Sequence, residues 1–314
     1  MNINGFFDEE GKNAEATAEE SFNKEEWAEL KQAERDAMKE TVPDQLKLIR
    51  DEAEWRESFL QMTGRLRKNY SLRNLILINS QCPEASLLFG FDDWKAKGYR
   101  INQGEKGIRI YEPSRINSED GSIKTVFNVR SVFDISQTNA PEALVVATSY
   151  DKEKLINAIA AASPYPIYPV EDLPNGIFAR TIEGKILIRK GATPRQVFGP
   201  LFREVLRLRI GLKEGAPEGP CAVFAASCSS FIITKHYGLE GEMSDFAALI
   251  NPPEEIISLE PDAFGGLLDT AIKAAGKLFA DMSFMLEERQ RELDKPKQAA
   301  IEEKKTKEKE GRTI

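Results

Sequence analysis

The chain has 314 residues, 41% of them hydrophobic and 30% charged, and its formal net charge is −8. This length allows about two domains with terminal tails, and no apolar run approaches the roughly 20 residues of a membrane span, so a membrane partner is not expected. The three cysteines, an odd and sparse set, and an N-terminus unlike a signal peptide predict a cytoplasmic protein with free thiols.

The first segment, residues 1–43, is acidic and has no sustained hydrophobic period. Thirteen acidic and five basic residues lie between Met1 and Leu46, a net charge of −8. We expect a disordered tail with, at most, a transient helix over residues 27–38. A solubilising role is the simpler interpretation of this tail, and competition with nucleic acid for a basic surface is the alternative.

A first domain is predicted over residues 44–140, and it begins with helices. Helical periodicity starts at Pro43 and continues to about residue 69. Ser71 is placed to cap a second helix over residues 72–80. A short helix is expected over residues 92–97, where a glycine follows it.

The hydrophobic pattern then changes to period two, over residues 108–111 and again over residues 125–135. This pattern predicts a small antiparallel hairpin with a polar loop at residues 117–121. The first domain is therefore α+β, and residues 137–143 have the composition of a linker.

A second α+β domain is predicted over residues 150–293, followed by a charged tail over residues 294–314 that is either disordered or a solvated helix. The turn dipeptide Glu183-Gly184 joins two of its strands, and Thr193 with Pro194 begins a helix. The expected helices cover residues 152–162, 194–210, 221–237 and 262–291, and the expected strands cover residues 167–170, 177–179 and 186–188.

The basic stretch, residues 65–111, differs in charge from the rest of the chain. It holds nine basic residues against four acidic ones, a net charge of +5, with Tyr70, Trp94, Tyr99 and Tyr111 among them. Cations that follow a phosphate backbone and rings on which bases stack are what single-stranded nucleic acid requires. Trp94 is better explained as a core anchor of its short helix.

Several spaced motifs then carry a family resemblance: Tyr70-Ser71 before Asn74, Trp94 before Gly98, Gly104-Glu105-Lys106-Gly107 before a strand, and the closing segment Val132–Thr138. In these motifs the chain resembles the N-terminal domain of ArdC-like antirestriction proteins and of the related LtrC-like proteins of conjugative elements. The resemblance implies that this domain binds single-stranded DNA.

The residues also support binding by themselves. The two glycines allow a tight turn or a close backbone approach, with Lys106 at its tip, and Arg109 and Tyr111 share one strand face. An ordinary hairpin turn with a solvated lysine is the alternative for the tetrapeptide, and Asn74 could instead cap a turn or bond to backbone. The predicted DNA-contacting residues are Arg67, Lys68, Tyr70, Arg73, Asn74, Lys95, Lys106, Arg109 and Tyr111.

The resemblance also implies a second domain like a zincin metallopeptidase, with two histidines in a His-Glu-x-x-His helix and an acidic third ligand on the next helix. In the corresponding helix only Glu204 keeps its identity, because Arg203 and Arg207 stand where the histidines belong. An arginine has no free lone pair for zinc. Residues 221–235 also contain no carboxylate, so we expect no metal, no cofactor and no peptidase activity, and a Glu204 that pairs with a nearby arginine.

A replacement metal site is not expected either. Cys221 and Cys228 are two helical turns apart, about 10 Å, which is too far for one tetrahedral ion. His236, the single histidine, follows eight residues later. The small apolar helix from Cys221 to Ile233 is better explained as a tightly packed core helix.

These observations predict a noncatalytic single-stranded DNA-binding protein of a conjugative or other mobile element, with a role in antirestriction or in DNA protection during transfer. Its expected partners are single-stranded DNA and restriction or conjugation proteins. The alternative is a protein-interaction module that binds an acidic partner and uses the degenerate peptidase-like domain as a scaffold. A surviving hydrolase is a third hypothesis, which stoichiometric zinc would support.

Overall fold

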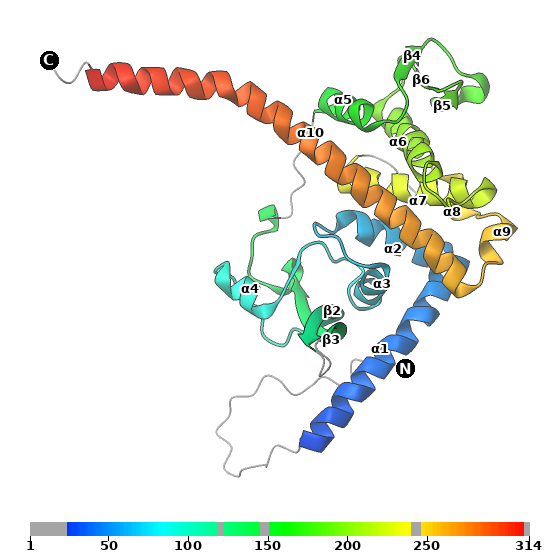
Figure 1. Ribbon diagram of the computed structural model, residues 1–314, viewed down its shortest axis with the longest axis vertical. Helices are drawn as coiled ribbons and strands as arrows, with labels where there is room; N and C mark the ends of the chain where they lie inside the picture. The colour runs from blue at the N-terminus through cyan, green and yellow to red at the C-terminus, as the bar shows by residue number, and fades with distance from the viewer. Residues whose placement is uncertain (1–23, 118–121, 145–150, 240–245, 311–314) are drawn as a thin grey trace. The chain divides into compact units, whose positions relative to one another are not determined.

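The computed structural model describes residues 24–117, 122–144, 151–239 and 246–310 (Figure 1). The fold is α+β, as predicted, and it divides into two compact units. Unit 1 contains residues 1–147 and 242–269, and unit 2 contains residues 148–241 and 270–314. None of the helices in the described ranges is both long and apolar enough to cross a membrane.

Unit 1 begins with three helices, α1 (Lys24–Asp51), α2 (Ala53–Arg65) and α3 (Leu72–Gln81). The predicted cap of α3 is confirmed, since Ser71 Oγ accepts a hydrogen bond from the Asn74 N–H. Residues 24–42 differ from the expectation of a disordered tail because they lie in α1, with Pro43 inside the helix rather than at its start. Residues 1–23 of the predicted tail lie outside the described residues.

Two kinds of contact stabilise the first part of α1. Its surface carries ion pairs at helical spacing, Lys31–Glu34 at 3.2 Å and Asp36–Lys39 at 2.9 Å. Met38 is buried in a cluster with residues from α3 and the sheet. Such packing is what usually stabilises a helix of polar composition, and a sequence pattern does not reveal it.

The sheet of unit 1 confirms the change to period two, with longer strands than predicted. Strands β2 (Ile108–Asn117) and β3 (Ile123–Asp134) pair as an antiparallel ribbon with Tyr111 opposite Val129. The short strand β1 (Leu88–Phe89), which was not predicted, adds to β3 and gives the order β1-β3-β2. Residues 118–121 of the predicted hairpin loop lie outside the described residues.

Trp94, on α4 (Phe91–Ala96), is completely buried and lies in the core of unit 1. Its indole N–H donates to the carbonyl oxygen of Phe133 at 2.9 Å, and the edge of the Phe89 ring meets it at 5.0 Å between centroids. The interpretation of Trp94 as a core anchor is therefore confirmed.

The closing segment Val132–Thr138 holds two loops of unit 1, the loop after α3 and the turn that carries Lys106. The buried carboxylate of Asp134 accepts from the N–H groups of Ser86 (2.7 Å) and Leu87 (3.0 Å), and from the N–H (3.0 Å) and hydroxyl (2.8 Å) of Ser136. Gln137 Nε2 donates to the Lys106 carbonyl at 2.8 Å. Gln137, expected in a linker, is thus held in the domain.

A separate piece of chain completes unit 1, and the sequence did not predict it. Helices α8 (Ala247–Ile250) and α9 (Glu254–Ile257) belong to this unit. The buried guanidinium of Arg56 donates to the Leu249 carbonyl at 2.7 Å and to the Arg50 carbonyl. These contacts over a long sequence separation explain why residues 242–269, predicted within the second domain, group with the first.

Unit 2 follows the predicted order of elements closely. Its sheet consists of β4 (Ile167–Val170), β5 (Ala179–Ile182) and β6 (Lys185–Arg189) in the order β4-β6-β5, with β4 parallel and β5 antiparallel to β6. The predicted Glu183-Gly184 turn joins β5 to β6. Of the two alternatives for the residues from 294, a helix or a disordered tail, the structure has the helix, because α10 (Pro261–Glu310) continues to Glu310. The elements are α5 (Lys152–Ala162), β4 (Ile167–Val170), β5 (Ala179–Ile182), β6 (Lys185–Arg189), α6 (Pro194–Gly211), α7 (Gly219–His236) and α10 (Pro261–Glu310), whose residues from 270 lie in this unit.

The core of unit 2 is centred on α7, which is buried from Phe224 to Thr234. Small polar side chains in this helix bond to neighbouring backbones: Ser230 Oγ donates to the Gly199 carbonyl and Ser229 Oγ to the Ala271 carbonyl, both at 2.8 Å. The prediction of a tightly packed core helix is confirmed, because these serines approach the adjacent main chain directly.

Candidate nucleic-acid interface

The nine predicted DNA-contacting residues differ in exposure. Arg67, Tyr70 and Arg109 are half-buried, and Asn74 and Tyr111 are buried. The exposed members are Lys68, Arg73, Lys95 and Lys106. A phosphate can reach each of these exposed cations directly, so they are the candidate phosphate contacts, and the buried members need a separate account.

Two of the exposed cations lie against tyrosine rings. The Lys68 Nζ is 5.6 Å from the centroid of Tyr70, and the Arg73 Cζ is 5.6 Å from that of Tyr111. Burial raises the pKa of Tyr70 to about 12, so its hydroxyl remains a hydrogen-bond donor throughout the neutral range. Two cation–ring contacts therefore lie within the basic stretch, one to the half-buried Tyr70 and one to the buried Tyr111.

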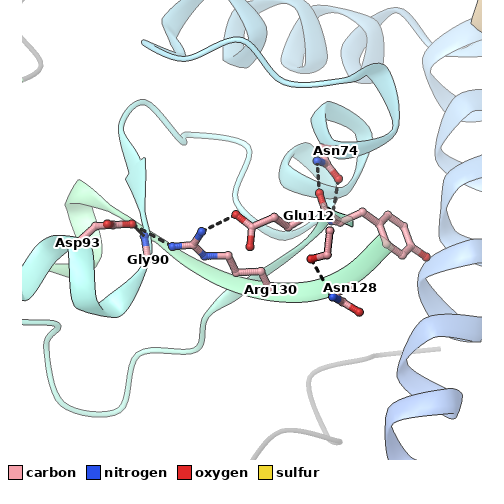
Figure 2. Close-up of polar contacts among 8 residues, drawn as sticks. Asn74, Gly90, Asp93, Glu112, Asn128 and Arg130 are labelled. Carbon is pink, nitrogen blue, oxygen red and sulfur yellow. Dashed lines mark hydrogen bonds and ion pairs between the residues drawn. The ribbon is translucent and has the colours of Figure 1, made fainter. Parts of the chain in front are cut away.

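Asn74 binds the backbone of the edge strand β2 (Figure 2). Its Nδ2 donates to the Tyr111 carbonyl at 2.8 Å, and its Oδ1 accepts from the Tyr111 N–H at 2.9 Å. Gln81 makes the same pair of bonds two residues earlier, with the N–H (2.9 Å) and the carbonyl (3.0 Å) of Arg109. Helix α3 thus holds β2 through two amides, as the alternative interpretation of Asn74 anticipated, and Gln81 was missed.

Arg109 and Tyr111 share one face of β2, and α1 covers it. Arg109 Nε lies 3.0 Å from Glu34 Oε1, in an ion pair whose side chains are only 20% and 6% exposed. The Tyr111 hydroxyl donates to the Arg35 carbonyl at 3.3 Å, and its ring packs against Met38. An acidic residue of the N-terminal segment therefore neutralises one of the predicted DNA-contacting cations.

The turn that carries Lys106 has two glycines with definite roles. Gly104 has φ of 86°, where other residues are strained. A Cβ at Gly107 would lie 2.8 Å from the Cβ of Ser131 on β3, so the turn needs a glycine there to approach the ribbon. Lys106 is exposed between them, as expected for the tip of a tight turn.

Arg130, which the sequence did not single out, joins α4 to the ribbon (Figure 2). Its NH2 lies 3.0 Å from Asp93 Oδ2, and its NH1 pairs with Glu112 on β2. A Cβ at Gly90 would lie 2.5 Å from Arg130 NH2, so the guanidinium occupies space that only a glycine leaves. Because its guanidinium pairs with two carboxylates, Arg130 links α4 to β2 and is not counted as a phosphate contact.

The region where a metal helix was anticipated is held by a different chemistry. Glu204 Oε2 accepts from the Thr181 N–H (3.0 Å), the Thr181 hydroxyl (2.6 Å) and Arg207 (3.1 Å). The expected pairing of Glu204 with an arginine is confirmed for Arg207. Across the described ranges, no three His, Cys, Asp or Glu residues gather as a metal site.

Two other residues that were considered as metal ligands, Cys228 and His236, pack against neighbouring side chains. His236 packs edge-on against Phe279 with ring centroids 3.9 Å apart, and Cys228 is buried in α7. Burial raises the pKa of the Cys82 thiol to about 11, which leaves it protonated and weakly nucleophilic at neutral pH.

Comparison with known proteins gives a family for part of the chain. Residues 38–133 match the N-terminal domain of anti-restriction factor ArdC. An uncharacterized protein of Bacillus anthracis, pXO2-81, is 26% identical over 227 residues, and the match covers 55% of this chain but only 38% of that protein. Two crystal structures of the antirestriction ArdC protein from the R388 plasmid, metal-free and Mn(II)-bound, are 18% and 16% identical. They match 69% and 68% of this chain and 86% of theirs, each with a TM-score of 0.47.

Proposed function

Because the chain belongs to the ArdC-like proteins through its N-terminal domain, residues 38–133, we propose that it binds single-stranded DNA and serves antirestriction on a mobile genetic element. The observation that carries this proposal is the exposure of Lys68, Arg73, Lys95 and Lys106, two of them beside tyrosine rings. Exposed cations suit the phosphates of a flexible strand, and the half-buried Tyr70 offers a ring beside Lys68, whereas the ring of Tyr111 is buried.

The test is fluorescence anisotropy of the full chain with a labelled single strand at several salt concentrations. Four phosphate contacts predict a slope of about −3 for the logarithm of affinity against that of salt. Changing Lys68, Arg73 and Lys106 to glutamine should reduce the slope by about 2. The charge-matched control changes the exposed Lys47, Lys152 and Lys277 to glutamine and should leave it unchanged. Undetectable binding at micromolar protein, or binding that does not change with salt concentration, would contradict the proposal.

The acidic helix α1 is proposed to restrain this binding through the Glu34–Arg109 pair. Glu34→Gln should release Arg109 for a phosphate and steepen the salt slope by about 0.7. Glu40→Gln removes the same charge from an exposed position of α1 and is the matched control. Equal effects of the two variants would show that only the net charge matters. Deleting residues 1–42 is a poorer test, since it removes Met38 from the core.

Unit 2 is proposed to be noncatalytic. Glu204, the one residue that matches the metallopeptidase motif, has three donors on a single carboxylate oxygen and joins α6 to β5. This arrangement supports a structural role for the carboxylate. Mass spectrometry of the purified protein should find no stoichiometric zinc, and one zinc per chain would contradict the proposal.

The protein-interaction alternative predicts a different outcome of the same binding experiment. An acidic protein would use the exposed cations but would not need the rings beside them. If the labelled strand never binds while an acidic protein is retained by the wild type and lost by the Lys68, Arg73 and Lys106 variant, the alternative is favoured.

A further inference from the structure

A second segment of the chain is more strongly basic than the basic stretch of unit 1, and it lies in unit 2. Residues 179–213 hold nine basic residues against Glu183 and Glu204, a net charge of +7. Several are neutralised by carboxylates from elsewhere in the unit: Arg189 pairs with Asp172, Lys190 with Glu171 and Arg209 with Asp281. The others need a separate explanation.

Apart from Lys213, which follows α6, three of these cations have no carboxylate within ion-pair distance in the part of the chain that the structure describes. They are Arg180 on β5, Lys185 on β6 and Arg203 on α6, with Arg180 and Lys185 exposed and Arg203 half-buried. Unpaired cations are common on solvated surfaces, so their relative placement decides whether they form a site.

The register of the sheet places two of these cations on one face together with an aromatic ring. Arg180 and Tyr168 both lie opposite Leu187, one on each side of β6, so the three residues form a row across the sheet. Lys185 lies on the same face, two residues from Leu187, with its Nζ 5.8 Å from the Tyr168 ring centroid. Tyr168 is 47% exposed, so this face is open and combines cations with a ring.

The other side of β5 adds the two arginines of the degenerate metal helix. Arg207 meets the same Glu204 oxygen as the N–H and hydroxyl of Thr181, which places its guanidinium beside the outer edge of β5. Arg203 is one helical turn earlier on the same face of α6. Cations therefore lie on both sides of the β5 edge.

The backbone of β5 argues against a peptide as the ligand of this edge. A bound peptide that extended the sheet would need the outward N–H of Thr181, and Glu204 already accepts from it at 3.0 Å. A nucleic-acid strand needs only the side-chain cations and a ring, both of which are present.

We propose that unit 2 carries a second single-stranded DNA surface, with Arg180, Lys185, Arg203 and Arg207 as phosphate contacts and Tyr168 as a stacking ring. The proposal rests on the proposed function for the identity of the ligand, although its residues all lie in the other unit. Arginines at the positions of the metal ligands thus give the degenerate helix a binding role.

The test uses the full chain with Arg180, Lys185 and Arg203 changed to glutamine, which leaves the Glu204–Arg207 pair intact. Its salt slope should fall by about 2, whereas the Lys47, Lys152 and Lys277 control should match the wild type. If the Arg180, Lys185 and Arg203 variant binds like the control, this inference is overturned. If the Lys68, Arg73 and Lys106 variant of unit 1 is weakened in the same experiment, the proposed function stands. If the unit 2 variant is weakened and the unit 1 variant binds like the control, this inference is supported and the proposed site in unit 1 is overturned.

A second variant separates stacking from charge. Tyr168→Ala should weaken binding about tenfold at every salt concentration without changing the slope, since stacking releases no counterions. Unchanged affinity of Tyr168→Ala for the labelled strand would overturn the role of Tyr168. Binding of an acidic protein in place of the strand would identify that protein as the ligand. Far-UV circular dichroism on heating verifies that each variant remains folded.

Discussion

Asp134→Ala should lower the free energy of unfolding of unit 1 by about 2–4 kcal/mol, because it removes the buried acceptor of four hydrogen bonds, two of them from the half-buried N–H groups of Ser86 and Leu87. Asp134 is 1% exposed, whereas Ser136 is exposed and its donors can turn to water, so the loss falls mainly on the N–H groups of Ser86 and Leu87. Asp134→Asn should cost less, since the amide oxygen can still accept from Ser86 and Leu87 but the amide nitrogen cannot accept from Ser136.

Tryptophan fluorescence during urea titration is the appropriate measurement, because all three tryptophans, Trp27, Trp55 and Trp94, belong to unit 1. Asp92→Ala, at an exposed position of α4, is the control and should leave the midpoint unchanged. A midpoint for Asp134→Ala equal to that of the control would show that Asp134 does not hold the loops of unit 1.

Asn74→Ala should cost about 2–4 kcal/mol of the stability of unit 1, because the N–H and carbonyl of Tyr111 lose their partners in a buried environment. If Asn74 instead contacts DNA, the substitution should weaken binding and leave stability unchanged. The same urea titration, together with the anisotropy experiment, separates these roles.

Asn69→Ala is the control for this experiment, since Asn69 is an exposed asparagine just before α3. Loss of DNA affinity in Asn74→Ala with an unchanged urea midpoint would contradict the structural role. A lower midpoint, with normal affinity in conditions where the variant is folded, would remove Asn74 from the DNA-contacting set.

Local patterns predicted the elements well where the signal lies within a few residues. The Ser71 cap, the change to period two at Ile108 and the start of α6 at Pro194 all agree with the structure. The two glycines around Lys106 were also interpreted correctly, because their requirement is a property of the turn itself.

The parts that the sequence did not predict depend on contacts between distant residues. The acidic composition of residues 24–42 suggested disorder, but Met38 finds a buried partner in Leu77. The ion pair between Glu34 and Arg109 joins residues of opposite charge that no local pattern connects. For the same reason, counting charges identified the basic stretch but not which of its cations remain available to a ligand.

The close approach of Gly90 and Arg130 makes these two positions dependent on each other. A side chain at position 90 would press on the NH2 end of the flexible Arg130 side chain and disturb its exposed ion pairs with Asp93 and Glu112, at a cost of about 1 kcal/mol or less. A shorter residue at position 130 would remove this conflict and would give up both ion pairs. During sequence divergence, substitutions at positions 90 and 130 are therefore expected to be correlated.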